Sequence, residues 1–210
     1  MPSPLLPYAL ACAGTYEASA IPQWQDELKT VHVYLSMIDG VHCIAWEGTT
    51  DWEEWFIDVM AAEVPMFGHL RLGPIALNWA RDVLTVIDQI DAYLKSLNYP
   101  PYDNTGHSKG AAECLLFHGF MKDRGHAPRH TFAFEAPRVG TSILRDFMAA
   151  DLIDQTVTVN THGKDIVTQV PWGPTYVDMR DPLMLFVPPT YDIATKHKIP
   201  AVIQALQAMA

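Results

Sequence analysis

A serine flanked by small residues is the clearest candidate for chemistry in this chain. Residues 105–110 read Thr-Gly-His-Ser-Lys-Gly, which matches G-x-S-x-G, and an apolar helix-forming run follows. In a nucleophile elbow, a strand turns sharply into a helix and the serine sits at the apex. Gly106 and Gly110 lack a Cβ and would let strand and helix approach closely. We therefore predict an elbow with Ser108 as nucleophile, while a plain Gly-Ser-Gly turn remains the alternative, because so short a pattern also arises by chance.

A serine hydroxyl needs a base within hydrogen-bond reach, and the base needs an acid that orients it. Proteins with such an elbow carry these groups in the order serine, acid, histidine. Asp165 lies five residues past an expected strand at 156–160, and His197 is the only histidine after it. The order predicts Asp165 as acid and His197 as base. The alternatives are Asp178, Asp181 and Asp192 for the acid, and His162 and His107 for the base. We expect His107 to point away from the serine.

Two backbone N–H groups are expected to bind a developing oxyanion. One is that of Lys109, because it opens the helix after the elbow. The second should come from a loop after an early strand, and Gly48-Thr49-Thr50 is placed for that. Thr49 is the predicted donor; Thr50 is the alternative, or it caps the next helix.

A short helix with an aromatic face is expected after that loop. Trp52, Trp55, Phe56 and Val59 follow i, i+3, i+4, i+7 spacing and so share one side. This face either packs on the core or forms a hydrophobic flap beside the site.

The elements that must position these residues alternate between strand and helix. Expected strands lie at 31–38, 41–46, 102–105, 131–134 and 156–160, and expected helices at 5–18, 75–97, 109–122, 142–150 and 199–206. Such alternation indicates an α/β fold in three layers, αβα, with a mainly parallel central sheet. Its ligands bind at the carboxyl ends of the strands. We find no repeat or linker, and we expect one domain over residues 1–210.

Three stretches fit this scheme less directly. The strand before the elbow is short and polar, since it holds Asp103, Asn104 and Thr105. Residues 64–74 contain two prolines and two glycines and are predicted to be a loop. The proline-rich stretch 171–189 is predicted to fold over, with a short hairpin at 176–187.

Composition narrows the function further. The chain has 210 residues and a formal net charge of −10, which argues against nucleic acid or an anionic membrane surface as partner. The three cysteines lie in apolar runs and are expected to be buried free thiols. His32 and His42 are expected to be ordinary strand residues, so no metal or other cofactor is predicted.

The N-terminal apolar patch is interrupted by prolines and has no basic residue before it. It lacks the features of a signal peptide, and no stretch approaches the roughly 18 apolar residues of a spanning helix. We expect a cytoplasmic location, or at least no recognisable signal peptide, and leave secretion open.

Four patches together resemble the class 3, or fungal-type, lipases of the α/β-hydrolase superfamily. Residues 48–52 with Asp58 resemble the family's R-G-[ST]…[DN]-W…D segment, and 105–110 resemble T-G-H-S-L-G. Residues 134–140 resemble F-x-x-P-R-V-G, and 160–171 resemble the acid-bearing N-x-x-D-x-V-P-x-x-P stretch. The set covers about residues 31–200. The departures are Glu47 for the usual arginine, Lys109 for leucine and Ala111 for the second glycine.

The resemblance implies Ser108 as nucleophile, Asp165 as acid, His197 as base, and Thr49 with Lys109 as the oxyanion pair. It also implies a lid near 50–62, which would carry Trp52, Trp55 and Phe56. The expected function is a serine carboxylic-ester hydrolase that acts on small-molecule or lipid esters, with transient contact with a lipid interface as an option. The alternatives are a thioesterase or acyltransferase with the same triad, or a non-catalytic domain that binds lipid or protein.

Overall fold

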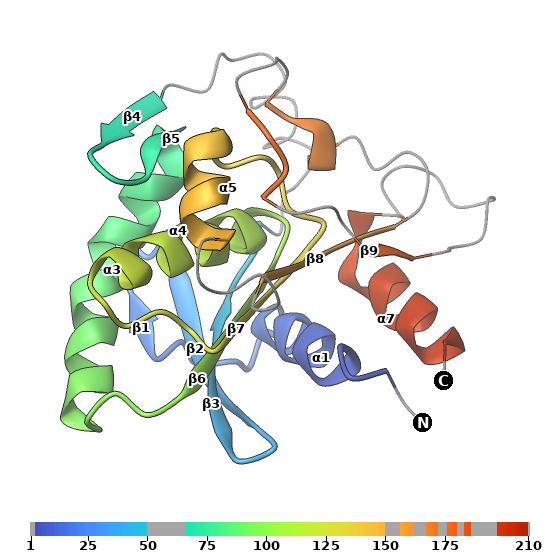
Figure 1. Ribbon diagram of the computed structural model, residues 1–210. Coiled ribbons are helices and arrows are strands. Elements are labelled where there is room, and N and C mark those ends of the chain that lie inside the picture. The colour runs from blue at the N-terminus through green and yellow to red at the C-terminus, as the bar shows by residue number, and fades with distance from the viewer. Residues whose placement is uncertain are drawn as a thin grey trace.

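The computed structural model describes residues 3–49, 66–149, 156–161, 167–171, 176–179, 183–185 and 197–209. Within these ranges, seven strands form one sheet in the order β1-β2-β3-β6-β7-β8-β9 (Figure 1). The strands are β1 Trp24–Gln25, β2 His32–Ile38, β3 Val41–Trp46, β6 Tyr102–His107, β7 His130–Phe134, β8 Thr156–Thr161 and β9 Leu183–Leu185. The first three pair antiparallel, and every pairing from β3 to β9 is parallel. The predicted mainly parallel sheet is confirmed.

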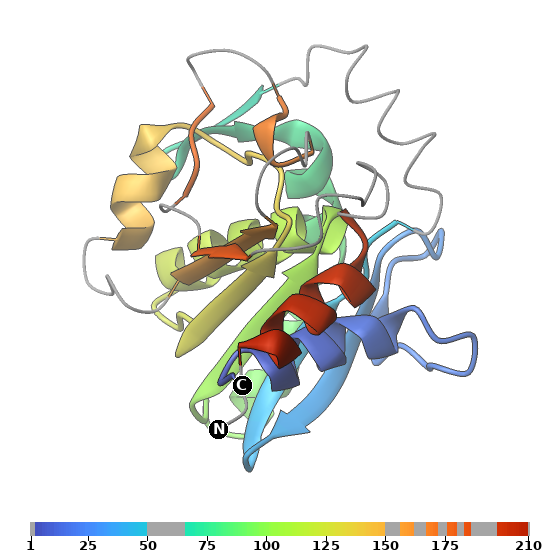
Figure 2. The same cartoon turned by 90° about the vertical axis from the view of Figure 1, so that its right-hand side faces the viewer.

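Helices cover both faces of this sheet. One face carries α3 Leu77–Ser96, α4 Lys109–Asp123 and α5 Ser142–Ala149, and the other carries α1 Leu6–Thr15 and α7 Ile199–Ala208. Figure 2 shows α1 and α7 lying side by side against the sheet. A 3-10 turn, η1, spans Val167–Gln169. The three-layer αβα arrangement is the predicted α/β-hydrolase fold.

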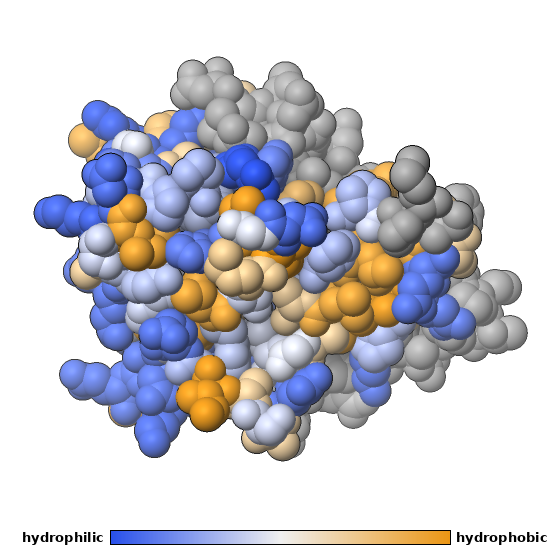
Figure 3. All heavy atoms as spheres, turned by 90° about the horizontal axis from the view of Figure 1, so that it is seen from below, coloured by the Kyte–Doolittle hydropathy of each residue, from blue (hydrophilic) through white to orange (hydrophobic). Residues whose placement is uncertain are grey.

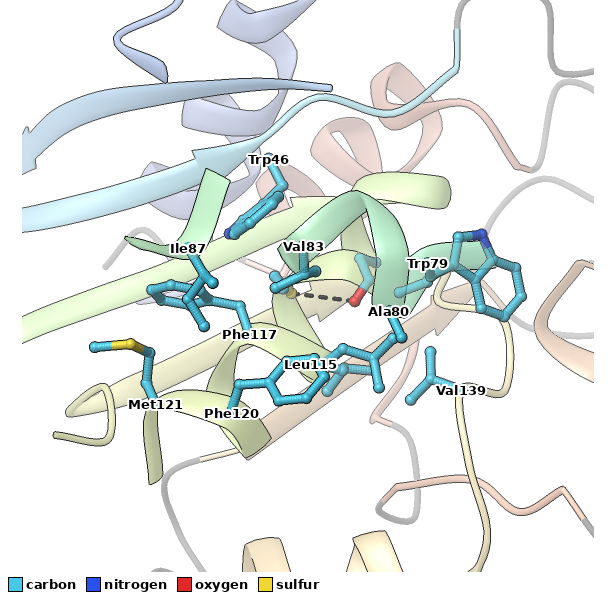
Figure 4. Packing of buried hydrophobic residues seen from close by; sticks show 14 of the residues in the cluster. Trp46, Trp79, Ala80, Val83, Ile87, Leu115, Phe117, Phe120, Met121 and Val139 are labelled. Carbon is cyan, nitrogen blue, oxygen red and sulfur yellow. Dashed lines mark hydrogen bonds between the residues drawn. The ribbon is translucent and has the colours of Figure 1, made fainter. Parts of the chain in front are cut away.

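Two apolar clusters hold the layers together because strand side chains alternate between the faces. Ile44 and Trp46 of β3 join the cluster under α3 and α4, while Cys43 joins the one under α1 and α7. Figure 4 shows Val83 and Ile87 of α3 packed near Phe117 of α4. The apolar face of α3 thus packs against α4 and fixes its position. Since α4 begins directly after Ser108, this packing also positions the serine.

The strand before the elbow is longer than predicted and completely buried despite its polar residues. Asn104 Oδ1 accepts a hydrogen bond from Trp46 Nε1 at 2.9 Å, and its amide nitrogen donates to the Cys114 carbonyl at 2.7 Å. Thr105 donates to the Phe132 carbonyl at 2.9 Å. The strand tolerates these residues because their polar atoms are paired inside the core.

Two expectations about loops are wrong. Residues 64–74 were expected to be a loop, but β4 Met66–His69 pairs antiparallel with β5 Gly73–Ala76. Pro74 is tolerated because β5 is an edge strand of a two-stranded sheet. The expected hairpin at 176–187 is also absent from the described residues 176–179 and 183–185. Leu183–Leu185 instead pairs parallel with β8, and Leu185 is buried in the cluster under α1 and α7.

The other local expectations agree with the structure where it describes them. Cys12, Cys43 and Cys114 are buried free thiols, and burial raises the pKa of Cys12 to about 12. His32 and His42 lie on β2 and β3. The expected aromatic helix with Trp52, Trp55 and Phe56 lies outside the described residues. No helix in the described ranges is both long and apolar enough to cross a membrane.

Candidate active site

Ser108 occupies the sharp turn between β6 and α4. Its backbone has φ 57° and ψ −124°, a region that non-glycine residues rarely adopt. Its N–H donates to the Phe134 carbonyl at 3.0 Å, and its own carbonyl accepts from Ala111 and Ala112 in the first turn of α4. These bonds on both sides hold the strained conformation, which is typical of residues at functional sites.

The glycines of the motif are required by the close approach of backbone segments. A Cβ on Gly106 would collide with the carbonyl of Gly110, and a Cβ on Gly110 would collide with the carbonyl of Trp46. Gly48 is similarly restricted, since a Cβ there would meet the Tyr16 hydroxyl and lie 2.6 Å from the His107 carbonyl oxygen. Strand β6, helix α4 and the loop after β3 therefore converge at the serine.

His197 reaches the serine from the other end of the described chain. Its Nε2 lies 2.7 Å from Ser108 Oγ, and both side chains are almost fully buried. His197 directly precedes Lys198, the N-cap of α7. This hydrogen bond between a hydroxyl and an imidazole is the contact through which a base activates a serine.

Some of the other predicted site residues lie near Ser108, and others lie outside the described residues. Lys109 is the first residue of α4, where backbone N–H groups have no partner within the helix. Thr49 lines a cavity of about 340 Å³ together with Ser108 and His107. Asp165 lies outside the described residues, as do Asp181, Asp192 and His162. The alternative acid Asp178 pairs with Arg138, whose Nε lies 3.2 Å from Asp178 Oδ1.

The cavity beside the serine is mainly apolar and lies between the two ends of the described chain. Its walls come from α1, the loop after β3, the elbow and the start of α7. The lining residues beyond those already named are Ala13, Tyr16, Lys198, Ile199 and Pro200. Sequence reasoning missed the contribution of α1, because nothing in its composition distinguishes a cavity wall from an ordinary surface helix.

His107 does not act on Ser108 in this arrangement. Its Nδ1 lies 2.9 Å from the Tyr16 hydroxyl, and its Nε2 lies 2.6 Å from the His197 carbonyl oxygen. The alternative of His107 as base is therefore disfavoured, since its two ring nitrogens already face other groups. Motif spacing alone carried no signal for the contact with Tyr16, because that contact joins residues 91 positions apart.

A second cavity, lined mainly by polar residues, shares Thr49 with the first. It measures about 200 Å³ and is lined by Thr30, His32, Glu47, Gly48, Thr49 and Lys109. Glu47 Oε2 lies 2.7 Å from His32 Nδ1 and accepts from the Tyr34 hydroxyl at 3.0 Å. Glu47 therefore takes part in a local polar network at the end of β3.

Lys109 also has a role for its side chain. Its ammonium lies 3.0 Å from Asp82 Oδ2 on α3 and 3.0 Å from Glu113 Oε1 one turn along α4. Burial tends to lower the pKa of Lys109, but the two carboxylates outweigh it and raise that pKa above its ordinary value. Lys109 thus stays charged and ties the start of α4 to α3.

Among the described residues, no group of His, Cys, Asp or Glu could hold a metal ion.

A model of the class 3 lipases matches residues 43–174, which is more than half of the chain. The chain belongs to the class 3 lipase family. The matched segment includes the elbow, the loop with Thr49 and residues 43–46 of β3, the strand that precedes that loop. No curated protein sequence gives a significant match.

Solved structures of lipases share the fold of this class 3 lipase at low sequence identity. A triacylglycerol lipase whose catalytic centre is described as a serine protease triad aligns with a TM-score of 0.70 and 14% identity, over 86% of this chain and 77% of that one. A triacylglycerol lipase from Penicillium expansum gives 0.63 and 13%, over 88% and 79%. The triacylglyceride lipase of Rhizomucor miehei gives 0.60 and 14%, over 78% and 64%.

Proposed function

We propose that this class 3 lipase hydrolyses carboxylic esters with Ser108 as nucleophile, His197 as general base and Asp165 as the acid that orients His197. The observation that carries the proposal is the 2.7 Å contact between His197 Nε2 and Ser108 Oγ at a strained strand-to-helix turn. Family membership and the match to lipase folds support the reaction class. The role proposed for Asp165 rests on its order in the chain, after the serine and before the histidine.

The chemistry follows from the groups around the serine. His197 takes the proton from Ser108 Oγ as the oxygen attacks the ester carbonyl, and a tetrahedral oxyanion forms. The backbone N–H groups of Lys109 and Thr49 are the proposed donors to that oxyanion. His197 then gives the proton to the leaving alcohol. Water attacks the acyl-serine, with His197 again as base, and releases the acid.

The substrate class follows from the cavity beside Ser108. A volume of about 340 Å³ is at the lower end for small-molecule sites, and the lining is mainly apolar. We therefore expect an ester with an apolar portion of short to medium length, either lipid-like or a small ester. Nothing in this mechanism requires a cofactor.

Replacement of the nucleophile tests the proposal. Ser108→Ala should lower the turnover of p-nitrophenyl butyrate by at least about 10³-fold, because the attacking oxygen is gone. A fluorophosphonate probe should label wild-type protein at Ser108 and leave the variant unlabelled. Circular dichroism should show the same fold for both.

Two results would contradict this function. Full turnover by a correctly folded Ser108→Ala variant would exclude Ser108 as nucleophile. Wild-type protein that neither turns over the ester nor takes up the probe would instead fit a non-catalytic binding domain.

A further inference from the structure

We propose that Tyr16 and His107 form a positioning pair. The pair holds two groups in place relative to Ser108: the loop after β3 that carries Thr49, here called the oxyanion loop, and the base His197. The inference rests on the proposed function and adds two residues to it. Neither residue exchanges a proton with the substrate. Each acts through the backbone of a neighbour that does chemistry.

The first link joins Tyr16 to the loop that carries Thr49. Tyr16 ends α1 as its C-cap, and its hydroxyl is so close to Gly48 that a Cβ on Gly48 would collide with it. Burial raises the pKa of Tyr16 well above its ordinary value, and a hydrogen bond from the Gly48 amide partly opposes that rise. Because Gly48 immediately precedes Thr49, the hydroxyl fixes the start of the oxyanion loop.

The second link joins Tyr16 to His107. The tyrosine oxygen lies 2.9 Å from His107 Nδ1. In the neutral ring Nδ1 therefore accepts the hydroxyl proton of Tyr16, because the ring proton is needed at the other nitrogen. The other ring nitrogen, Nε2, must carry a proton, because its partner is a carbonyl oxygen.

The third link joins His107 to the base. Nε2–H donates to the His197 carbonyl at 2.6 Å, so the backbone that carries the imidazole of His197 is anchored from the elbow itself. His107 is 5% exposed and His197 1%. Water has little access to replace a lost bond at this depth, so removing a partner leaves a polar group unsatisfied.

The three links form one continuous chain, and in each of its hydrogen bonds a donor faces an acceptor. The Tyr16 hydroxyl lies against Gly48 and donates to His107, and His107 donates to the His197 carbonyl. The oxyanion donor binds the carbonyl oxygen of the ester while the base acts on Ser108 Oγ and on the leaving alcohol. An error of about 1 Å in either position costs on the order of 10²-fold in rate. A shared anchor on α1 and the elbow keeps the two groups at a fixed separation.

The main test removes only the tyrosine hydroxyl. Tyr16→Phe should reduce kcat for p-nitrophenyl butyrate by about tenfold and change KM less than about twofold, because geometry at the reacting atoms is lost while the cavity remains. Tyr8→Phe is the matched control. Tyr8 also lies on α1 and donates a buried hydrogen bond to β6, but its acceptor is Asp103, at the far end of the strand from Ser108.

A conservative pair at position 107 tests the bond to His197. The side-chain amide of His107→Gln can replace Nε2–H as a donor to the carbonyl, whereas His107→Leu fills similar space without a donor. The Gln variant should keep kcat within about fivefold of wild type, and the Leu variant should lose about 10²-fold. Long-range ¹H–¹⁵N NMR of the wild type should show His107 as the Nε2–H tautomer.

Several outcomes would overturn the pair. They are a Tyr16→Phe kcat equal to that of Tyr8→Phe, equal activity of the Gln and Leu variants, and an Nδ1–H tautomer for His107. Wild-type protein without esterase activity or Ser108 labelling would refute the proposed function itself. An active wild type with an unaffected Tyr16→Phe variant would refute only the positioning role.

Discussion

Glu113 is a fully buried carboxyl one helical turn beyond Lys109. Its Oε1 lies 3.0 Å from the Lys109 ammonium, which also pairs with Asp82. Burial raises the pKa of Glu113 to about 8, although the positive charge of Lys109 opposes the rise. The folded protein therefore retains a proton on this carboxyl at pH values where the unfolded chain has released it.

This difference predicts a pH dependence of stability. The ordinary pKa of the carboxyl is 4.5 and the folded value is about 8, so its contribution is complete below pH 4.5 and is lost as pH rises toward 8. The loss is at most about 5 kcal/mol, since one pKa unit corresponds to about 1.4 kcal/mol. Glu113→Gln should flatten this decline in the free energy of unfolding, measured by urea denaturation from pH 4 to 9. Equal slopes for both proteins would contradict the prediction.

Residue identities near the serine were predictable where chain order and spacing carry the information. Gly106, Ser108 and Gly110 form one local motif, and His197 followed because no other histidine comes after Asp165. The role of Tyr16 could not be read from the sequence. It depends on α1 packing beside the elbow, a contact between residues 91 positions apart.

Strand β6 is held at its start by a buried carboxylate with three partners. Asp103 accepts from Tyr8 Oη at 2.7 Å and from two nitrogens of Arg129, and it lies 3.1 Å from His130 Nδ1. Burial raises the pKa of Asp103, but these partners outweigh it and hold the pKa below its ordinary value of 3.8. The ionised carboxylate thus joins α1, β6 and β7.

Removing the guanidinium should destabilise this end of the sheet. Arg129→Met should lower the free energy of unfolding by about 2 kcal/mol at pH 7, because Asp103 keeps its burial but loses its main partner. Asp103 has a depressed pKa, so its contribution is present above pH 3.8 and is lost as pH falls below it. The variant should therefore differ less from wild type in acid. Chemical denaturation at pH 7 and pH 3 measures both effects.

Arg124→Met is the matched control for that experiment. Arg124 pairs with Asp88 at 2.7 Å and Asp91 at 3.1 Å on the surface between α3 and α4. Exposed ion pairs contribute less than about 1 kcal/mol. A loss as large for Arg124→Met as for Arg129→Met would show that burial of Asp103 is not the cause.

Elements with strong periodicity were predictable, and those defined by distant pairing were not. The apolar stripe of α3 indicated a long helix, and β2 and β3 were indicated by their β-formers and the Asp39-Gly40 turn. The sequence indicated only a short, polar strand at 102–105. The full length and burial of β6 were not predictable, because the partners of Asp103 and Asn104 come from other elements. Leu183–Leu185 becomes a strand only because β8 offers an edge.

The chain as a whole is acidic, with 14 basic (Lys and Arg) and 24 acidic (Asp and Glu) residues. On the face seen in Figure 3, hydrophilic residues are interspersed with separate apolar patches. A net charge of −10 repels anionic surfaces, and this repulsion is screened by salt. The charge thus bears on which lipid surfaces the proposed hydrolase can approach.

This repulsion predicts a dependence on lipid charge. The same p-nitrophenyl ester should be hydrolysed more slowly in phosphatidylcholine vesicles that contain phosphatidylglycerol than in pure phosphatidylcholine. The difference should be several-fold at about 10 mM salt and nearly absent at about 500 mM, where the Debye length falls to a few ångströms. Faster hydrolysis on the anionic vesicles at low salt would contradict it.

Helices α1 and α7 pack together although they stand at opposite ends of the described chain (Figure 2). Tyr16 caps the end of α1, and the histidine that contacts Ser108 stands two residues before α7. A polypeptide still emerging from the ribosome therefore has its elbow long before it has its base. On the proposed chemistry, a chain cut short before residue 197 carries the nucleophile without its base and is inert toward the lipids of the cell that makes it.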